Sequence, residues 1–146
     1  MKTTKELIRE VLDRWGFPVR HEGEVSVSFR YQMYMVGAAA GGTEEQPAVG
    51  MTLIGVFSAD NEKEMERGLR ACNEVNEGMM HVKAYIDSDS DLILASEFFY
   101  KGEEDMEYLM KAGLDTLVAG RKRFIAKYRE LEEEARLLAE LDEAGD

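Results

Sequence analysis

Residues 69–100 read LRACNEVNEGMMHVKAYIDSDSDLILASEFFY, and this stretch carries the pattern that decides the fold. Apolar residues at helical spacing begin just before this stretch and continue into it. They predict a helix, and Gly78 ends it. These residues are Met65, Leu69, Cys72 and Val75. Apolar residues at every second position then predict two half-buried strands, at about residues 80–87 and 91–100. The stretch therefore predicts a helix followed by an antiparallel hairpin.

The polar tip of this hairpin, Asp87-Ser88-Asp89-Ser90-Asp91, has carboxylates at alternate positions, as a calcium-binding loop has. An EF-hand loop also needs a glycine at its sixth position and a glutamate at its twelfth, where this sequence has Leu92 and Phe98. Asp and Ser are typical of tight exposed turns, because their side chains bond to nearby backbone groups. We therefore predict a turn here and no metal site.

The amino-terminal part predicts a helix and a first hairpin. Thr3 and Glu6 have capping-box spacing, which begins the first helix. Alternating apolar residues then predict one long strand over 25–35. Residues 37–47 read GAAAGGTEEQP, which predicts a mobile turn, and residues 49–58 have the composition of a second strand.

Two more helices complete the expected order. Asp60 or Asn61 caps the second helix, and the third is amphipathic from about Glu104 to Tyr128. The predicted fold class is α+β, an antiparallel sheet with helices packed on it, in the order α-β-β-(β)-α-β-β-α. We expect one domain over residues 1–130 and an acidic helical extension over residues 131–146.

The charge of the chain is strongly negative and uneven. The formal net charge is −12, and residues 130–146 contribute eight acids against one base, Arg136. An acidic surface repels phosphate backbones, so nucleic acid is not an expected partner.

The cellular location follows from weaker signals. Cys72 is the single cysteine and cannot form an intramolecular disulfide. The first residues, MKTTKELIRE, become amphipathic and acidic at once, unlike a secretory signal. No apolar run approaches the roughly 20 residues that span a bilayer. We expect a cytoplasmic protein with no membrane association.

The residues that could carry chemistry do not form a catalytic pattern. His21 and His81 lack the spacing of a metal site, and Cys72 falls on the apolar stripe of the second helix, where a thiol behaves as a small buried hydrophobe. The glycines of residues 37–42 precede a strand, whereas phosphate loops precede a helix. We therefore predict a protein that is not an enzyme and has no cofactor.

Two sets of residues are candidates for binding or for structure. Apolar side chains near the end of the first strand form the candidate partner-binding or dimer surface: Tyr31, Met33, Tyr34, Met35 and Val36. Asn73 and Asn76 precede Gly78, where their amides can bond the last helix carbonyls and the start of the next strand. We favour this structural role for the two asparagines over ligand binding.

Residues 69–100 resemble the YbjN family, described as bacterial sensory transduction regulators with a fold like that of type III secretion chaperones. The likeness rests on Leu69, Asn73, Asn76, the acidic turn and the strand LILASEFF, and the opening helix with WGFPV also fits, so it covers about residues 5–128. It implies an α+β domain, commonly a homodimer, that binds a protein partner. In secretion chaperones such dimers hold an extended effector segment.

Two hypotheses for function remain open at this point. The first is a non-catalytic, chaperone-like or regulatory domain that binds a protein partner of unknown identity and acts as a homodimer. The alternative is a sensory regulator that binds a small molecule between the sheet and the carboxyl-terminal helix. An enzyme is the third and least favoured reading.

Overall fold

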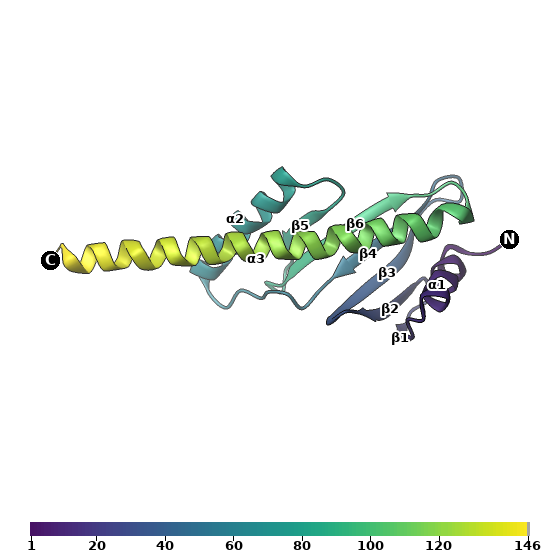
Figure 1. The fold of residues 1–146 in the computed structure, drawn as a ribbon, viewed down its shortest axis with the longest axis horizontal. Helices are drawn as coiled ribbons and strands as arrows, with labels where there is room; N and C mark the ends of the chain where they lie inside the picture. The colour runs from purple at the N-terminus through teal and green to yellow at the C-terminus, as the bar shows by residue number, and fades with distance from the viewer. Residues whose placement is uncertain (146) are drawn as a thin grey trace.

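The structure is a computed structural model that describes residues 1–145, and it contains one antiparallel sheet with helices on one face (Figure 1). The helices are α1 (Thr4–Trp15), α2 (Glu62–Gly78) and α3 (Met106–Ala144), with a short 3₁₀ turn, η1 (Glu103–Asp105), before α3. The strands are β1 (Val19–Glu22), β2 (Ser26–Tyr31), β3 (Tyr34–Gly42), β4 (Pro47–Leu53), β5 (Lys83–Ile86) and β6 (Leu92–Phe99). The α+β prediction is confirmed.

The six strands are hydrogen-bonded in the order β1-β2-β3-β4-β6-β5, with every neighbouring pair antiparallel. The predicted second hairpin is the β5–β6 pair, and it joins the first part of the sheet because β6 pairs with β4. Between α1 and α2 there are four strands, whereas the sequence predicted two or three. Strand β1 was not predicted.

The prediction of one long strand over residues 25–35 is wrong. Chain reversal occurs at Gln32 and Met33, so that Tyr31 at the end of β2 pairs with Tyr34 at the start of β3. Gln32 has φ of 55°, in the left-handed region that a glycine or asparagine usually occupies. The turn was missed because its sequence contains neither residue.

The mobile turn predicted over residues 37–47 is also wrong in its extent. Strand β3 continues to Gly42, and only residues 43–46 connect it to β4. The glycines and alanines of this segment pair with β4 throughout, from Val36 opposite Leu53 to Gly42 opposite Pro47. The small residues of this segment therefore belong to the sheet and not to a loop.

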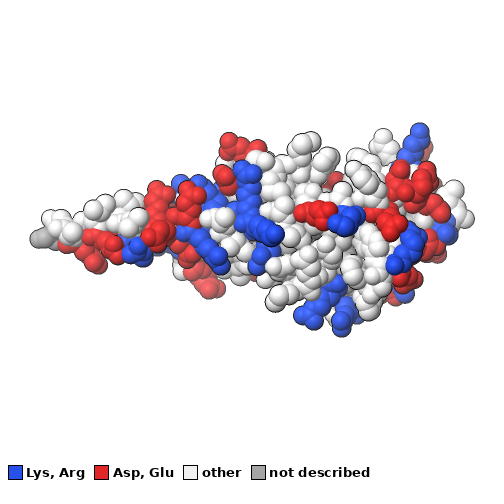
Figure 2. Space-filling model, in the orientation of Figure 1, with Lys and Arg blue, Asp and Glu red and all other residues white. Residues whose placement is uncertain are grey.

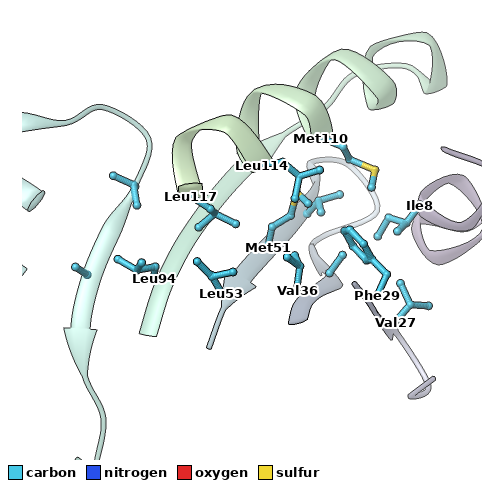
Figure 3. Close-up of a cluster of buried hydrophobic side chains, with 14 of the residues drawn as sticks. Ile8, Val27, Phe29, Val36, Met51, Leu53, Leu94, Met110, Leu114 and Leu117 are labelled. Atoms are coloured by element: carbon cyan, nitrogen blue, oxygen red, sulfur yellow. The ribbon is translucent and has the colours of Figure 1, made fainter. Parts of the chain in front are cut away.

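The core lies between the sheet and the three helices, and Figure 3 shows the part of it that α1 and α3 cover. Strand residues such as Phe29, Met51 and Leu94 meet Leu114 and Leu117 of α3, and all five are fully buried. At roughly 25 cal/mol per Å² of apolar area removed from water, this packing is the main source of stability. The buried strand residues therefore lie on the face of the sheet that the helices cover.

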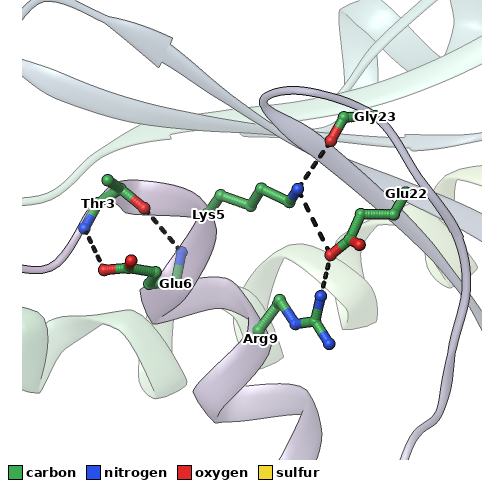
Figure 4. A network of polar contacts seen from close by, with 6 residues as sticks. All are labelled: Thr3, Lys5, Glu6, Arg9, Glu22 and Gly23. Carbon is green, nitrogen blue, oxygen red and sulfur yellow. Dashed lines mark hydrogen bonds and ion pairs between the residues drawn. The ribbon is translucent and has the colours of Figure 1, made fainter.

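Helix α1 is fixed at its beginning and along one side (Figure 4). The Thr3 hydroxyl accepts a hydrogen bond from the Glu6 backbone N–H at 3.1 Å, and the Glu6 carboxylate accepts one from the Thr3 N–H at 2.9 Å. This is the predicted capping box. Lys5 also donates to the Gly23 carbonyl at 2.8 Å, which ties α1 to the β1–β2 connection.

Helix α3 runs unbroken from Met106 to Ala144 and extends well beyond the sheet (Figure 1). The predicted boundary between residues 1–130 and 131–146 lies inside this helix, and Asp146 lies outside the described residues. The division into two parts stays a prediction.

Candidate protein-binding surface

One face of the sheet is covered by no helix in the described part of the chain, and a shallow trough of about 560 Å³ lies on it. Strand residues line the trough, together with Gly23 of the β1–β2 connection. We call this surface the open face.

The floor of the trough consists of two rows of residues that cross the strands. The strand register places the following residues side by side in the first row: His21, Ser28, Gly37, Thr52, Ala95 and Lys83. The second row contains Ser26, Ala39, Gly50 and Glu97. Both rows line the trough, and their central residues are small. A second backbone can therefore approach this sheet closely.

Charged groups stand at the two ends of the trough. Lys83 and Glu97 form an ion pair at 2.5 Å at one end, and the Lys83 ammonium lies 5.9 Å from the centre of the Tyr85 ring. The hydrogen bond to Glu97 raises the pKa of Lys83 above its usual value. His21 and Glu22 stand at the opposite end. The trough thus offers a neutral floor between polar ends.

Two hydroxyl groups, those of Ser28 and Thr52, belong to the floor of the trough. The Ser28 Oγ atom is buried and has no hydrogen-bond partner within residues 1–145. A Cβ atom added to Gly37 would lie 3.0 Å from the Thr52 hydroxyl, so Thr52 stands directly beside that glycine. A polar group of a bound chain could bond to the Thr52 hydroxyl.

Sequence reasoning missed this surface, although a signal was present. Gly37 and Ala39 alternate with the buried Val36 and Ala38 of β3, which is the pattern of a strand with one side of small residues. The number of glycines led to the prediction of a turn. Across the sheet, Gly50 occupies the same kind of position in β4.

The candidate surface over Tyr31, Met33, Tyr34, Met35 and Val36 is not one continuous exposed patch. Val36 is 1% exposed and belongs to the core, so its assignment to a surface is wrong. Tyr31 packs against Phe17, and Tyr34 lies under the Arg121 guanidinium at 4.6 Å from the ring centre. The turn at Gln32 and Met33 places Tyr31 and Tyr34 opposite one another on neighbouring strands.

Met33 is the one fully exposed member of that set, whereas Tyr31, Tyr34 and Met35 are half-buried. Met33 is 84% exposed at the turn. Met35 is half-buried and pairs with Arg30 beside the trough. A contribution of these methionines to a partner contact stays a prediction.

Asn76 connects the end of α2 to β5. Its amide donates to the Ala84 carbonyl at 3.0 Å, and its carbonyl accepts from the Ala84 N–H at 2.8 Å. Asn73 lies one turn earlier, is exposed, and lines a shallow pocket with Leu69 and Lys127. The two asparagines therefore have different surroundings.

The hairpin tip at residues 87–91 is a turn closed by its own side chains. The Asp87 carboxylate accepts hydrogen bonds from the N–H groups of Asp89 at 2.9 Å and Asp91 at 3.0 Å, and Asp91 accepts one from the Ser58 hydroxyl at 2.7 Å. Ser90 has φ of 66°, as a tight turn requires. Within residues 1–145, no group of three or more potential His, Cys, Asp or Glu ligands is placed to hold a metal ion.

Cys72 is buried on α2, as its position on the apolar stripe predicted. Burial raises the pKa of its thiol to about 11, which disfavours the thiolate.

The space between the sheet and α3 is filled by core side chains over most of its length. At the edge where β6 meets α3, a pocket of about 200 Å³ is lined by residues that include Phe98, Leu109 and Gly113. Small-molecule sites usually enclose about 300–1,000 Å³. This pocket is the place where a ligand between the sheet and the last helix would bind, and it is small.

Comparisons with known proteins give one family and several solved structures. The YbjN family model, described as "Putative bacterial sensory transduction regulator", matches residues 4–114. No curated protein matches the sequence. No helix within residues 1–145 is long and apolar enough to cross a membrane.

Solved structures similar to this one come from archaea and bacteria. An uncharacterized protein from Methanothermobacter thermautotrophicus has a TM-score of 0.59 at 13% identity, and the match covers 88% of this chain and 98% of that one. The crystal structure of YbjN from E. coli, titled "a putative transcription regulator", has a TM-score of 0.55 at 11% identity, with coverage of 78% and 85%. The Yersinia pestis type III secretion chaperone SycH, in complex with a stable fragment of YscM2, has a TM-score of 0.49 at 13% identity, with coverage of 80% and 98%.

Proposed function

This chain belongs to the YbjN family, and from that premise we propose that it is a non-catalytic regulatory or chaperone-like domain that binds a protein partner on the open face of its sheet and acts as a homodimer. The observation that carries the proposal is the trough with its two rows of small residues. A cytoplasmic location belongs to the same proposal and agrees with a single, buried cysteine.

The shape of the trough favours a polypeptide over a small molecule. Small-molecule sites bury about 70–90% of their ligand, which needs an enclosed cavity, whereas this trough is open along the sheet. Gly37 and Gly50 leave the backbone accessible, so that a partner strand or loop can lie flat on it. The Thr52 hydroxyl can bond to a partner's peptide groups.

The test compares a trough variant with a matched variant elsewhere. Ala39→Gln adds bulk at the centre of the trough, and Ala119→Gln makes the same change at an exposed position of α3. Each full-length chain is used as bait in affinity purification from native cells. We expect a partner that is retained by the unmodified chain and by Ala119→Gln and is lost with Ala39→Gln. Equal retention by both variants would contradict a role of the open face.

The homodimer is tested separately by sedimentation. The unmodified chain should sediment with twice the monomer mass of 16.5 kDa. A monomer at high micromolar concentration would contradict this part of the proposal.

A further inference from the structure

The end of α3 carries an apolar face that no other part of the described chain covers. Leu137, Leu138 and Leu141 are 47%, 56% and 68% exposed, and their spacing places them on one side of the helix. We call residues 131–145 the projecting end, because here α3 has left the sheet (Figure 1). Three exposed leucines on one helix face are typical of a contact with another helix.

The apolar face of the projecting end begins where α3 still touches α2. Leu131 is 3% exposed, and it lines a groove of about 290 Å³ between the two helices. Leu138, two turns later, reaches the end of the same groove. The apolar stripe of α3 that packs against α2 therefore continues beyond α2, where no described part of the chain covers it.

A second groove lies beside the first, between α2 and α3. It has a volume of about 470 Å³ and is lined by Leu69, which is 51% exposed, together with Arg70, Asn73 and Lys127. Glu66 and Glu74 also line this groove, so the apolar side chain lies among charged groups of both signs. Such a groove fits an amphipathic helix with leucines on one side and acids next to them.

The grooves carry a small excess of positive charge, whereas the projecting end is acidic. Four cations of α2 and α3 line the two grooves, against three anions, Glu66 and Glu74 of α2 and Glu134 of α3. The cations are Lys63, Arg67, Arg70 and Lys127. Lys63 and Arg70 form no ion pair within residues 1–145. Figure 2 shows Lys and Arg where the projecting end leaves the body, and Asp and Glu along it.

The acids of the projecting end are largely unpaired. It carries six acids against Arg136, which pairs with Glu133 and Glu140 of the same helix at 2.5 Å each. The other four acids form no ion pair in the described part of the chain: Glu132, Glu134, Asp142 and Glu143. The carboxylates can therefore meet cations of another molecule.

The projecting end cannot place Leu137 and Leu141 in the grooves of its own chain, since α3 is one continuous helix that points away from them. We propose that it binds between α2 and α3 of a second copy of this chain, with the two α3 helices antiparallel. A two-fold axis forms both contacts at once, each copy giving its leucines and acids to the other copy's grooves. The projecting end spans about 21 Å and α2 about 26 Å at 1.5 Å per residue, so the lengths match. The inference rests on the proposed homodimer and names its surface.

The first test removes the apolar contact. The double variant Leu137→Gln/Leu141→Gln changes two exposed side chains, so the monomer should keep its circular dichroism spectrum and melting temperature. We expect the dimer Kd, measured by sedimentation equilibrium, to rise at least roughly tenfold, and to rise further with salt. Tyr108→Gln is the matched control, because Tyr108 is 75% exposed on α3 at its other end. An unchanged Kd in the double variant would overturn the inference.

The second test separates the two sides of the contact. Arg70→Glu reverses a cation of the groove and should also weaken the dimer. An equimolar mixture of Arg70→Glu chains with the double leucine variant should form a heterodimer more stable than either homodimer. One of its two contacts joins an intact projecting end to an intact groove, and the other gathers both changes, whose costs do not add in full within one contact that is already lost. No preference for the heterodimer would overturn the inference. If the unmodified chain were monomeric, the proposed homodimer itself would fail; if it stayed dimeric with both variants, only this surface would be wrong.

Discussion

Asn76 and Ala84 exchange two hydrogen bonds, one in each direction, across the connection between α2 and β5. The donor–acceptor distances are 3.0 Å from the Asn76 amide and 2.8 Å from the Ala84 N–H. Ala84 lies in an edge strand, and its N–H and carbonyl have this side chain as partner on the side away from β6. The Asn76 side chain thus provides the hydrogen-bond partners that a further strand would provide at this edge of the sheet.

We expect Asn76→Ala to lower the free energy of unfolding by about 1–3 kcal/mol, because it leaves two partly buried backbone groups of Ala84 without partners. Asn73→Ala is the control. Asn73 is exposed, and its substitution should change stability by no more than about 0.5 kcal/mol. Urea unfolding of the two variants measures the difference, and equal values would contradict the role given to Asn76.

The turn between β2 and β3 predicts a stabilising substitution. Gln32 has φ of 55°, a conformation that costs an L-residue about 1–2 kcal/mol and costs glycine little. Gln32→Gly should therefore raise the free energy of unfolding by several tenths to about 1 kcal/mol, after the entropy that glycine gives to the unfolded chain. Met33→Gly, at the neighbouring position without positive φ, should not stabilise. A loss of stability in Gln32→Gly would show that the side chain matters more than the backbone.

Cys72 predicts a pH dependence of stability. Burial raises its pKa in the folded protein from 9.0 to about 11, so the folded state holds this proton more tightly than the unfolded state. The stabilisation is complete below pH 9.0 and is lost as the pH rises from 9.0 through about 11. Cys72→Ala should flatten the decrease of unfolding free energy over this range. Val75→Ala, a change at another buried position of α2, should keep the slope of the unmodified chain.

The hairpin tip predicts no response to calcium. The Asp87 carboxylate is already bonded to two backbone N–H groups, and Asp91 is bonded to Ser58. The glycine and glutamate of a calcium loop are absent from the sequence. Melting temperature measured during a calcium titration should stay constant. A saturable rise would contradict the assignment of this segment as a turn alone.

Much of the fold could be predicted because it depends on local patterns. The capping box at Thr3, the helix that ends at Gly78 and the hairpin around residues 87–91 all rest on contacts between neighbouring residues, and all are present. The first hairpin could not be placed, since its turn at Gln32 has no glycine and the alternation of apolar residues continues through it. Side chains alternate between the two faces of a strand. The two-residue turn at Gln32 and Met33 therefore places Met35 on the face opposite to the one that a continuous strand predicts.

The candidate surface depended more on tertiary structure. Small residues at positions 37, 39 and 50 were visible in the sequence, but they form a floor only once β3 and β4 pair in the observed register. The grooves beside Leu69 and Leu131 likewise require α2 and α3 to lie side by side, and the residues of the two helices that line them are more than 50 positions apart in the chain. A local sequence pattern cannot predict a contact between residues that are so far apart in the chain.

The sequence by itself determined the α+β class, the helices, the second hairpin and the acidic amphipathic end, because these follow from the periodicity of side chains along one chain. Only the tertiary structure decided which face of the sheet stays open and that α3 leaves its leucines uncovered beyond Leu131. The physical reason is that burial depends on which elements meet. Residues with the same local pattern become core where a second element packs on them, and binding surface where none does.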